Sequence, residues 1–174
     1  MLAGVRSLGL RCLPWTRDLE QWRARVAFAR ANDPLGRERW PDVADAALLD
    51  TAEAWLAPWL EGITRREQLA RVDLRAALHA ILDWNAQQRL DRLAPTHLGV
   101  PSGSRIAIDY SSGVPTLAVR LQEVFGLAES PRIAEGRVPV TLELLSPARR
   151  IFTGTRRTIL VKLPVAFSGG SRLN

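Results

Sequence analysis

The hydrophobic pattern of this chain changes its period between Leu82 and Tyr110, and that change constrains the fold more than any other feature. Apolar residues recur at helical spacing up to Leu93, and Pro95 then interrupts the pattern. From Arg105 to Tyr110 large apolar residues occupy every second position. A period of about 3.6 residues indicates an amphipathic helix, whereas a period of two indicates a half-buried strand. The sequence therefore predicts a junction between a helical layer and a β layer near residue 95.

Helices are expected throughout the N-terminal half. Thr16 and Asp73 are the expected N-caps of two of them, because their side-chain oxygens accept hydrogen bonds from free backbone N–H groups. Thr64 and Glu67 have the spacing of a capping box, which predicts that a further, short helix starts there. The predicted helices run from Thr16 to about Ala31, from Val43 to Leu60, over a short stretch after Thr64, and from Asp73, directly or through a continuation, to Leu93.

Short strands are expected after Pro95. His97–Val100 and Arg105–Tyr110, separated by a Pro-Ser-Gly-Ser turn, predict a β-hairpin. The remaining expectations are a strand over Val114–Ala118, a short helix through Phe125, and an alternating strand region over Arg137–Leu145. The predicted fold class is α+β, with a helical N-terminal half packed on a small, mostly antiparallel β-sheet in the C-terminal half.

The charge of the chain is unevenly distributed. The 24 Lys and Arg residues exceed the 18 Asp and Glu residues, which gives a net charge of +6. All acidic residues precede residue 151, so the body is nearly balanced, whereas the last two dozen residues carry four cations and no acid. Two interpretations of the arginines stay open: an ion-paired, solvated surface, or a surface that binds phosphate groups.

Several classes of protein are disfavoured. Cys12 is the only cysteine, so neither an internal disulfide nor a cysteine-rich metal site is expected. No apolar run approaches the length of a membrane span, and the N-terminus lacks the long apolar region of a signal peptide, so we expect a cytoplasmic protein that does not enter membranes. The spacing of His79 and His97 suggests neither a catalytic triad nor a metal site; a structural role is expected for His79.

The motifs of a nucleotide hydrolase are missing from this sequence. No GxxxxGK[ST] loop is present to hold nucleotide phosphates, and no DEAH-like acidic box is present to hold Mg²⁺. The chain alone is therefore expected to have no catalytic residues, no metal and no cofactor.

Three segments carry a resemblance to a known family. LDWNAQQRLDRLAPTHL, PSGSRIAIDY and LAVRLQEVFGL resemble the C-terminal domain of HrpB-type bacterial DEAH helicases. The resemblance implies that ATP and Mg²⁺ bind in motor domains preceding this region. It also implies that the helicase motor core is a partner, that RNA or DNA is another, and that this region acts as an accessory domain. A protein–protein interaction module with no nucleic-acid role is the alternative.

The resemblance also implies a division of the chain. Residues 1–15 would be a linker and residues 16–150 the accessory domain, helical over 16–95 and β-rich over 96–150. Family members continue after Arg150 with a proline, a further helix and a basic Pro-rich end, which the sequence here does not match. Residues 151–174 are therefore expected to be a divergent tail, frameshifted or truncated, in which Thr158 to Phe167 is prone to form a strand.

A tentative nucleic-acid surface can be assembled from cations and small polar residues. Arg89 and Arg92 lie three residues apart on one predicted helix and so share a face. The 102–105 turn offers hydroxyl groups, backbone N–H groups and a cation, which suit a phosphate. Asp91 and Asp109 are alternative, intramolecular partners for these arginines. The candidate residues are Arg89, Arg92, Ser102, Ser104, Arg105, Arg149 and Arg150.

Aromatic residues are expected mainly in the core. Trp22, Trp55 and Trp59 lie on apolar helical stripes, and Trp84 is expected to be packed as well. Tyr110 falls on the apolar face of its strand, which favours burial over base stacking.

Overall fold

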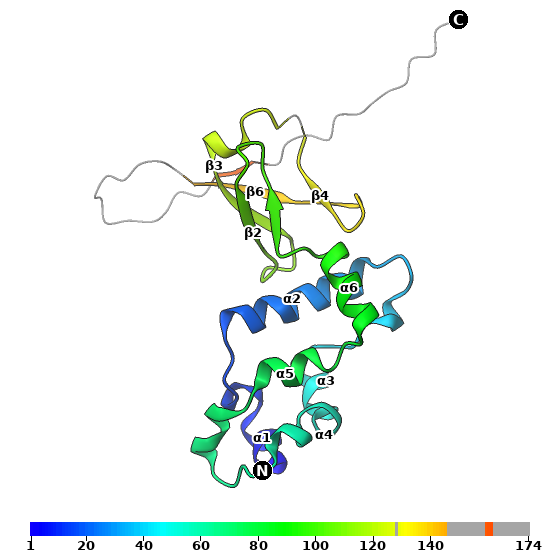
Figure 1. Cartoon of the computed structure of the whole chain (residues 1–174), viewed down its shortest axis with the longest axis vertical. Coiled ribbons are helices and arrows are strands. Elements are labelled where there is room, and N and C mark those ends of the chain that lie inside the picture. Colours follow the sequence, from blue (N-terminus) through cyan, green and yellow to red (C-terminus); the bar gives the residue numbers. More distant parts are fainter. Residues whose placement is uncertain (128, 146–158, 162–174) are drawn as a thin grey trace, which may run out of the picture. The chain divides into compact units, whose positions relative to one another are not determined.

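The structure, a computed structural model, describes residues 1–127, 129–145 and 159–161 (Figure 1). The chain divides into two compact units, Met1–Ala94 and Pro95–Asn174, which we call the helical unit and the sheet unit. The predicted α+β class is confirmed, since helices fill the first unit and strands dominate the second. The division follows the change of hydrophobic period at Pro95.

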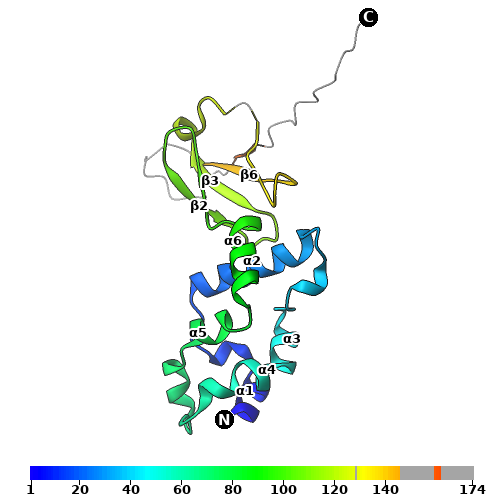
Figure 2. The same cartoon turned by 45° about the vertical axis from the view of Figure 1, so that its right-hand side comes forward.

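The helical unit is built from short helices. Its α-helices are α1 (Leu2–Leu8), α2 (Arg17–Asn32), α3 (Asp45–Asp50), α4 (Ala52–Trp55), α5 (Leu74–His79) and α6 (Trp84–Leu93). Between them lie the 3-10 helices η1 (Leu10–Cys12), η2 (Arg37–Arg39), η3 (Ala57–Leu60) and η4 (Arg66–Arg71). The long helix α2 contacts α6, which crosses it in both ribbon views (Figures 1 and 2).

The predicted caps account for several of these starts. Thr16 accepts a hydrogen bond from Leu19 N–H at 3.3 Å, and Asp73 accepts one from Ala76 N–H at 2.9 Å. The predicted capping box is displaced by one residue, because Arg65, not Thr64, is the N-cap of η4. The side chain of Gln68, not that of Glu67, accepts from the N–H groups at the start of η4, at 2.9 Å each.

The single helix predicted over Val43–Leu60 is interrupted. Thr51 has φ −93° and ψ 7°, outside the helical region, and separates α3 from α4. Pro58 then lies in the first turn of η3, where a proline is tolerated because no intrahelical partner is needed there. Three short helices take the place of one, and the apolar stripe is bent around the core.

The sheet unit contains a five-stranded sheet and a separate two-stranded ribbon. The strands are β1 (His97–Gly99), β2 (Arg105–Asp109), β3 (Thr116–Arg120), β4 (Arg132–Ile133), β5 (Val138–Pro139), β6 (Thr141–Leu145) and β7 (Ile159–Val161). The sheet order is β1-β2-β3-β6-β7, and β4 pairs with β5. A 3-10 helix, η5 (Leu121–Val124), follows β3.

The pairing is mostly antiparallel, as expected, with one exception. β1 and β2 form the predicted hairpin, with His97 opposite Ala107. β3 and β6 run parallel, with Leu117 opposite Leu142, because residues 121–140 return the chain to the same end of the sheet. β7 adds an antiparallel edge strand to β6 within the predicted strand-prone segment; the rest of that segment lies outside the described residues.

Each unit has its own apolar core. In the helical unit Val26, Leu48 and Leu78 are almost fully buried. In the sheet unit the almost fully buried residues include Leu117, Val119 and Tyr110. The burial of Tyr110 confirms that its strand position is a core position.

Candidate nucleic-acid interface

Helix α6 carries the first group of candidate residues, and its N-terminus is fixed by two side chains. Asp83 accepts a hydrogen bond from Ala86 N–H at 2.7 Å. The Gln87 amide donates to the carbonyl oxygens of His79 at 3.2 Å and Leu82 at 3.0 Å. These contacts attach the first turn of α6 to the end of α5, so the orientation of the helix faces is set locally.

The C-terminal end of α6 is fixed by Arg25 on α2. Arg25 Nε donates to the carbonyl oxygen of Ala94 at 2.6 Å, and Nη2 donates to Asp91 Oδ1 at 2.6 Å. Arg25 is buried, so its charge is balanced by Asp91 rather than by water. Asp91 was an expected partner for the candidate arginines; its partner is Arg25 instead.

Arg89 makes an ion pair within the helical unit. Its guanidinium contacts both carboxylate oxygens of Asp33, with Nε donating to Oδ2 at 2.6 Å. Trp40 Nε1 donates to Oδ2 and Leu35 N–H to Oδ1, each at 2.9 Å. The hydrogen bonds from Arg89, above all, hold the pKa of Asp33 well below its usual range. Arg89 therefore holds α6 to the end of α2, and the intramolecular interpretation applies to it, with Asp33 as partner.

Arg92 is exposed on α6, about 60° around the helix from Arg89, on the same side as the exposed Trp84 and Gln88. At about 100° per residue, Trp84, Gln88 and Arg92 fall within about 80° of one another, and Trp84 lies about 180° from the buried Leu93. Among the described residues Arg92 has no carboxylate within ion-pair distance. α6 therefore presents a row of an indole, an amide and a free guanidinium to solvent.

The exposure of Trp84 corrects the expectation that it is packed. Its side chain is 71% exposed, whereas Trp22 and Trp55 are buried as predicted. The signal was present in the sequence, because Trp84 directly follows the cap residue Asp83 and falls opposite the apolar positions of α6. Sequence reasoning grouped it with the preceding apolar stripe, which ends at Leu82, before the cap.

The 102–104 turn in the sheet unit differs from the expected phosphate cradle in one respect. The Gly103 N–H donates to the Val100 carbonyl at 2.9 Å, and the Ser104 N–H lies 3.4 Å from Ser102 Oγ. These backbone donors are therefore engaged within the turn. The two serine hydroxyls, 3.2 Å apart, and the exposed Arg105 are what the turn offers a ligand.

Arg149 and Arg150, the last two candidates, lie outside the described residues. Asp109 accepts hydrogen bonds from the N–H and hydroxyl groups of Ser111, at 2.8 and 2.6 Å. Arg105 has no ion-pair partner in the described part of the chain.

The histidines and the carboxylates show no catalytic arrangement among the described residues. The His79 ring stacks on Trp22 with centroids 5.2 Å apart, and burial lowers its pKa. His97 is exposed and contacts Thr96. No group of three His, Cys, Asp or Glu side chains within the described ranges has metal-binding geometry. None of the described helices is both long and apolar enough to cross a bilayer.

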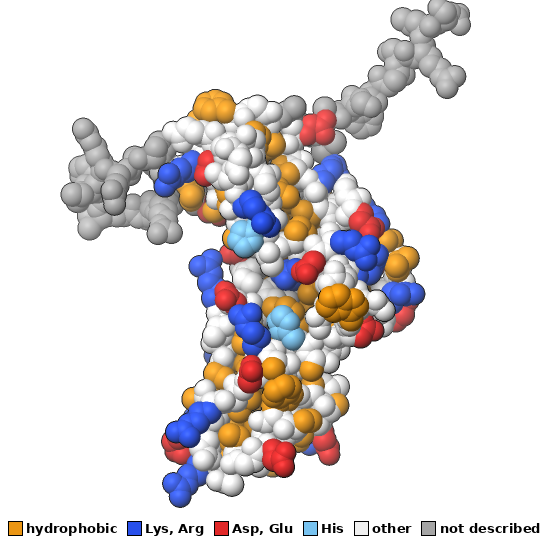
Figure 3. Space-filling model, viewed as in Figure 1, with side chains coloured by type: hydrophobic (Ala, Val, Ile, Leu, Met, Phe, Trp, Pro, Cys, Tyr) orange, Lys and Arg blue, Asp and Glu red, His pale blue; other side chains and the backbone are white. Residues whose placement is uncertain are grey.

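The surface charges are mixed rather than gathered. Figure 3 shows Lys and Arg side chains interspersed with Asp and Glu over the face in view. Ion pairs such as Arg30–Asp42 at 3.0 Å and Arg137–Glu135 at 2.8 Å account for part of this pattern. An interface with nucleic acid would therefore depend on a few unpaired cations and an aromatic ring, not on a broad basic surface.

Comparisons with known proteins agree with the resemblance. A family model described as "ATP-dependent helicase C-terminal" matches residues 55–158. The ATP-dependent RNA helicase HrpB of Escherichia coli K12 is 48% identical over 157 residues, which are 90% of this chain and 19% of that protein.

Two solved structures share the fold. The crystal structure of the E. coli DExH-box NTPase HrpB superposes with a TM-score of 0.77 at 48% identity, over 90% of this chain and 19% of that one. A crystal structure of the E. coli DEAH/RHA helicase HrpB gives a TM-score of 0.74 at 47% identity, over 90% and 20%. The chain thus spans about a fifth of the length of these relatives.

Proposed function

This chain belongs to the HrpB-type ATP-dependent helicase C-terminal family, and from that membership we propose that it contacts single-stranded nucleic acid through α6 while docking on the helicase motor core. The single observation that carries the nucleic-acid contact is the exposed row of Trp84, Gln88 and Arg92. A helicase handles single strands, whose bases are unstacked and available to an aromatic ring.

Each member of the row supplies a different interaction. The Trp84 indole offers a flat face on which a base of any identity stacks, worth about 1–3 kcal/mol. The Arg92 guanidinium attracts a backbone phosphate, and the Gln88 amide donates to or accepts from a base edge or sugar. Stacking and phosphate contact together favour binding that is tolerant of sequence.

Arg105 and the serine hydroxyls of the 102–104 turn form a second proposed contact, on the sheet unit. Their chemistry suits phosphate or ribose oxygens. Because each cation acts on the backbone, the two contacts should add affinity without adding sequence preference.

The test measures binding of the full chain to a fluorescent single-stranded oligonucleotide at several salt concentrations. We expect Trp84→Ala to weaken binding by about tenfold, the loss of one stacked base, and Trp84→Phe to retain part of the affinity. Arg92→Ala and Arg105→Ala should each weaken binding on all sequences and lower the salt slope by about 0.7.

Arg71→Ala is the matched control, because Arg71 is exposed on η4 and outside the proposed row. It removes the same charge from the chain. If Arg71→Ala weakened binding as much as Arg92→Ala, the attraction would be a general charge effect. If Trp84→Ala bound as wild type, α6 would have no role in nucleic-acid contact.

The motor core remains the proposed protein partner. In this proposal ATP and Mg²⁺ bind in motor domains of the parent helicase, and this chain spans only about a fifth of its helicase relative. In this proposal the motor hydrolyses ATP in the cytoplasm and this domain holds the strand near it. Comparing the affinities for an RNA and a DNA oligonucleotide of the same sequence would show which nucleic acid is preferred.

A further inference from the structure

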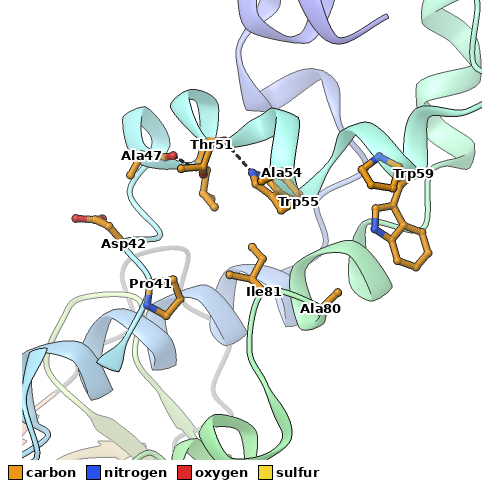
Figure 4. Close-up of a pocket in the computed structure, with 11 residues that line it drawn as sticks. Pro41, Asp42, Ala47, Thr51, Ala54, Trp55, Trp59, Ala80 and Ile81 are labelled. Atoms are coloured by element: carbon orange, nitrogen blue, oxygen red, sulfur yellow. Dashed lines mark hydrogen bonds between the residues drawn. The ribbon is translucent and has the colours of Figure 1, made fainter. Parts of the chain in front are cut away.

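The helical unit has an apolar hollow that the nucleic-acid proposal does not use. It encloses about 560 Å³ between the segment from Pro41 to Trp59 and the end of α5 at Ala80 and Ile81. In Figure 4, Pro41 and Asp42 lie at one end and Trp59 at the other, with Thr51 and Ala54 facing Ile81 across the hollow. Its walls are therefore mainly methyl, proline-ring and indole surfaces.

Trp59 is one of the two tryptophans that line this hollow. The sequence predicted that Trp59 is packed in the core, but its side chain is 37% exposed. Trp55, on the same wall, is buried and its indole N–H donates to the Leu48 carbonyl oxygen at 2.9 Å. The hollow thus has one wall tryptophan fixed by the fold and one left accessible to a ligand.

A second hollow of about 500 Å³ meets the first at Pro58, which lines both. Its other lining residues include Leu2, Ala57 and Leu60, with two carboxylates. We call the two hollows together the Pro58 groove. Its length spans η3 and parts of α3 and α4, which suits an extended or helical segment better than a small molecule.

The charged side chains on the Pro58 groove are all acidic. Asp42 lines the first hollow, Glu53 and Glu61 line the second, and no Lys or Arg side chain lines either. Between Arg39 and Arg65 the sequence contains five acidic residues and no basic one, although the whole chain carries a net charge of +6. In the fold, arginines from outside this segment pair with three of the five carboxylates, Asp42, Asp45 and Glu53, so the groove lining is acidic but part of its charge is compensated.

These carboxylates are available to a cationic ligand to different degrees. Asp42 accepts hydrogen bonds from the Ala44 N–H and from Arg30 Nη2, each at 3.0 Å, which lower its pKa, so a cationic ligand would share this carboxylate with Arg30. Glu53 lies 3.7 Å from Arg6, with both side chains largely exposed, and such a pair contributes little. Glu61 has no ion-pair partner among the described residues.

We propose that the Pro58 groove binds an amphipathic protein segment that places apolar side chains against Trp59 and Ile81 and Lys or Arg side chains beside Asp42, Glu53 and Glu61. An apolar groove with a charged rim is the usual receptor for an amphipathic helix, and opposite charge on the rim selects the partner. Nucleic acid does not fit, because three carboxylates would repel its phosphates. The groove and the exposed face of α6 are therefore separate sites with opposite charge preference.

The probe is a fluorescein-labelled synthetic helix of about 16 residues, or roughly four turns. Leu occupies one face and Lys the flanking positions; a second peptide has Glu in place of every Lys. Fluorescence anisotropy with the full chain should show saturable binding of the Lys peptide, and the Glu peptide should bind at least about tenfold more weakly.

Variants of exposed groove residues identify the site. Ala54→Arg fills the first hollow and should abolish binding of the Lys peptide. Glu53→Lys and Glu61→Lys should each weaken it by about three- to fivefold. The matched controls are Ala70→Arg and Glu67→Lys, which introduce the same side chains at exposed positions of η4, away from the groove. The controls should bind as wild type.

Several outcomes would overturn the proposal. One is the absence of saturable binding up to about 1 mM peptide, which corresponds to negligible affinity. Another is equal binding of the two peptides, or equal loss in the groove and control variants. Concentration-dependent dimerisation that Ala54→Arg abolishes would assign the groove to a second copy of this chain. Oligonucleotide binding by the Ala54→Arg variant tests the α6 proposal separately, and should be unchanged.

Discussion

At the scale of single residues, Asp33 has the most demanding environment in the described chain. Its carboxylate is fully buried and accepts hydrogen bonds from the Arg89 guanidinium, the Trp40 indole and the Leu35 N–H. A buried charge is tolerated only when its partners satisfy it fully, and removing one partner leaves the other charge uncompensated. Asp33 and Arg89 therefore act as one structural group that connects the end of α2 to α6.

We expect Asp33→Asn to lower the free energy of unfolding of the helical unit by about 2–4 kcal/mol at pH 7, because it leaves Arg89 without its counter-charge. Urea unfolding followed by tryptophan fluorescence measures this unit, since all six tryptophans lie between residues 15 and 84. Asp18→Asn is the control: Asp18 is exposed and lies 3.4 Å from Arg75, so its loss should cost little.

The same pair predicts a pH dependence. Folding lowers the pKa of Asp33 below the ordinary aspartate value of about 3.9. The stabilisation is therefore fully present well above pH 4 and is lost as the pH falls from there toward the folded-state pKa. The difference in stability between wild type and Asp33→Asn should shrink below about pH 4. A difference that stayed constant from pH 7 to acid would mean that the carboxylate charge is not what stabilises the unit.

At the scale of elements, the boundary between the two units lies directly after the end of α6, between Ala94 and Pro95. The Ala94 carbonyl accepts from Arg25 of the helical unit, at 2.6 Å, and the next carbonyl, of Pro95, accepts from the Tyr110 hydroxyl of the sheet unit, at 2.7 Å. Consecutive peptide groups are thus held by different units. The change from helix to sheet takes place over the three residues 94–96, between the end of α6 at Leu93 and the start of β1 at His97.

We expect Tyr110→Phe to destabilise the sheet unit by about 1–3 kcal/mol, because it leaves the Pro95 carbonyl without its partner. The Ile108 N–H, which donates to the Thr96 carbonyl at 3.0 Å, should then exchange faster, by about tenfold for each 1.4 kcal/mol. Amide hydrogen exchange by NMR measures this directly. Unchanged exchange at Ile108 would show that the hydroxyl contact contributes nothing to the unit.

Sequence patterns predicted the elements better than their contacts. Caps and periodicity located α2, α5, α6 and the β1–β2 hairpin, because these depend on neighbouring residues. The break at Thr51, the parallel pairing of β3 with β6 and the Asp33–Arg89 pair were missed, because each depends on residues distant in sequence. Trp84 was missed for another reason: its helical position was informative but was not weighed against the cap beside it.

At the scale of the whole molecule, the chain is the C-terminal domain of an HrpB-type helicase. Its sequence contains neither a phosphate-binding loop nor an acidic Mg²⁺ box, and it corresponds to about a fifth of a helicase relative. We expect the purified chain to release no phosphate from ATP, with or without a single-stranded oligonucleotide, in a coupled phosphate assay. Turnover that a point substitution in this chain abolished would contradict this and require a nucleotide site of a different kind.

The parallel pairing of β3 and β6 has a consequence for how this family can vary in length. The twenty residues from 121 to 140 leave the sheet after β3, form η5 and the β4–β5 ribbon, and return at β6. Closing a longer excursion costs only about 0.6 kcal/mol for each doubling of its length. Insertions and deletions in descendants of this gene should therefore accumulate at the tip of the β4–β5 ribbon, while β3 and β6 keep their register.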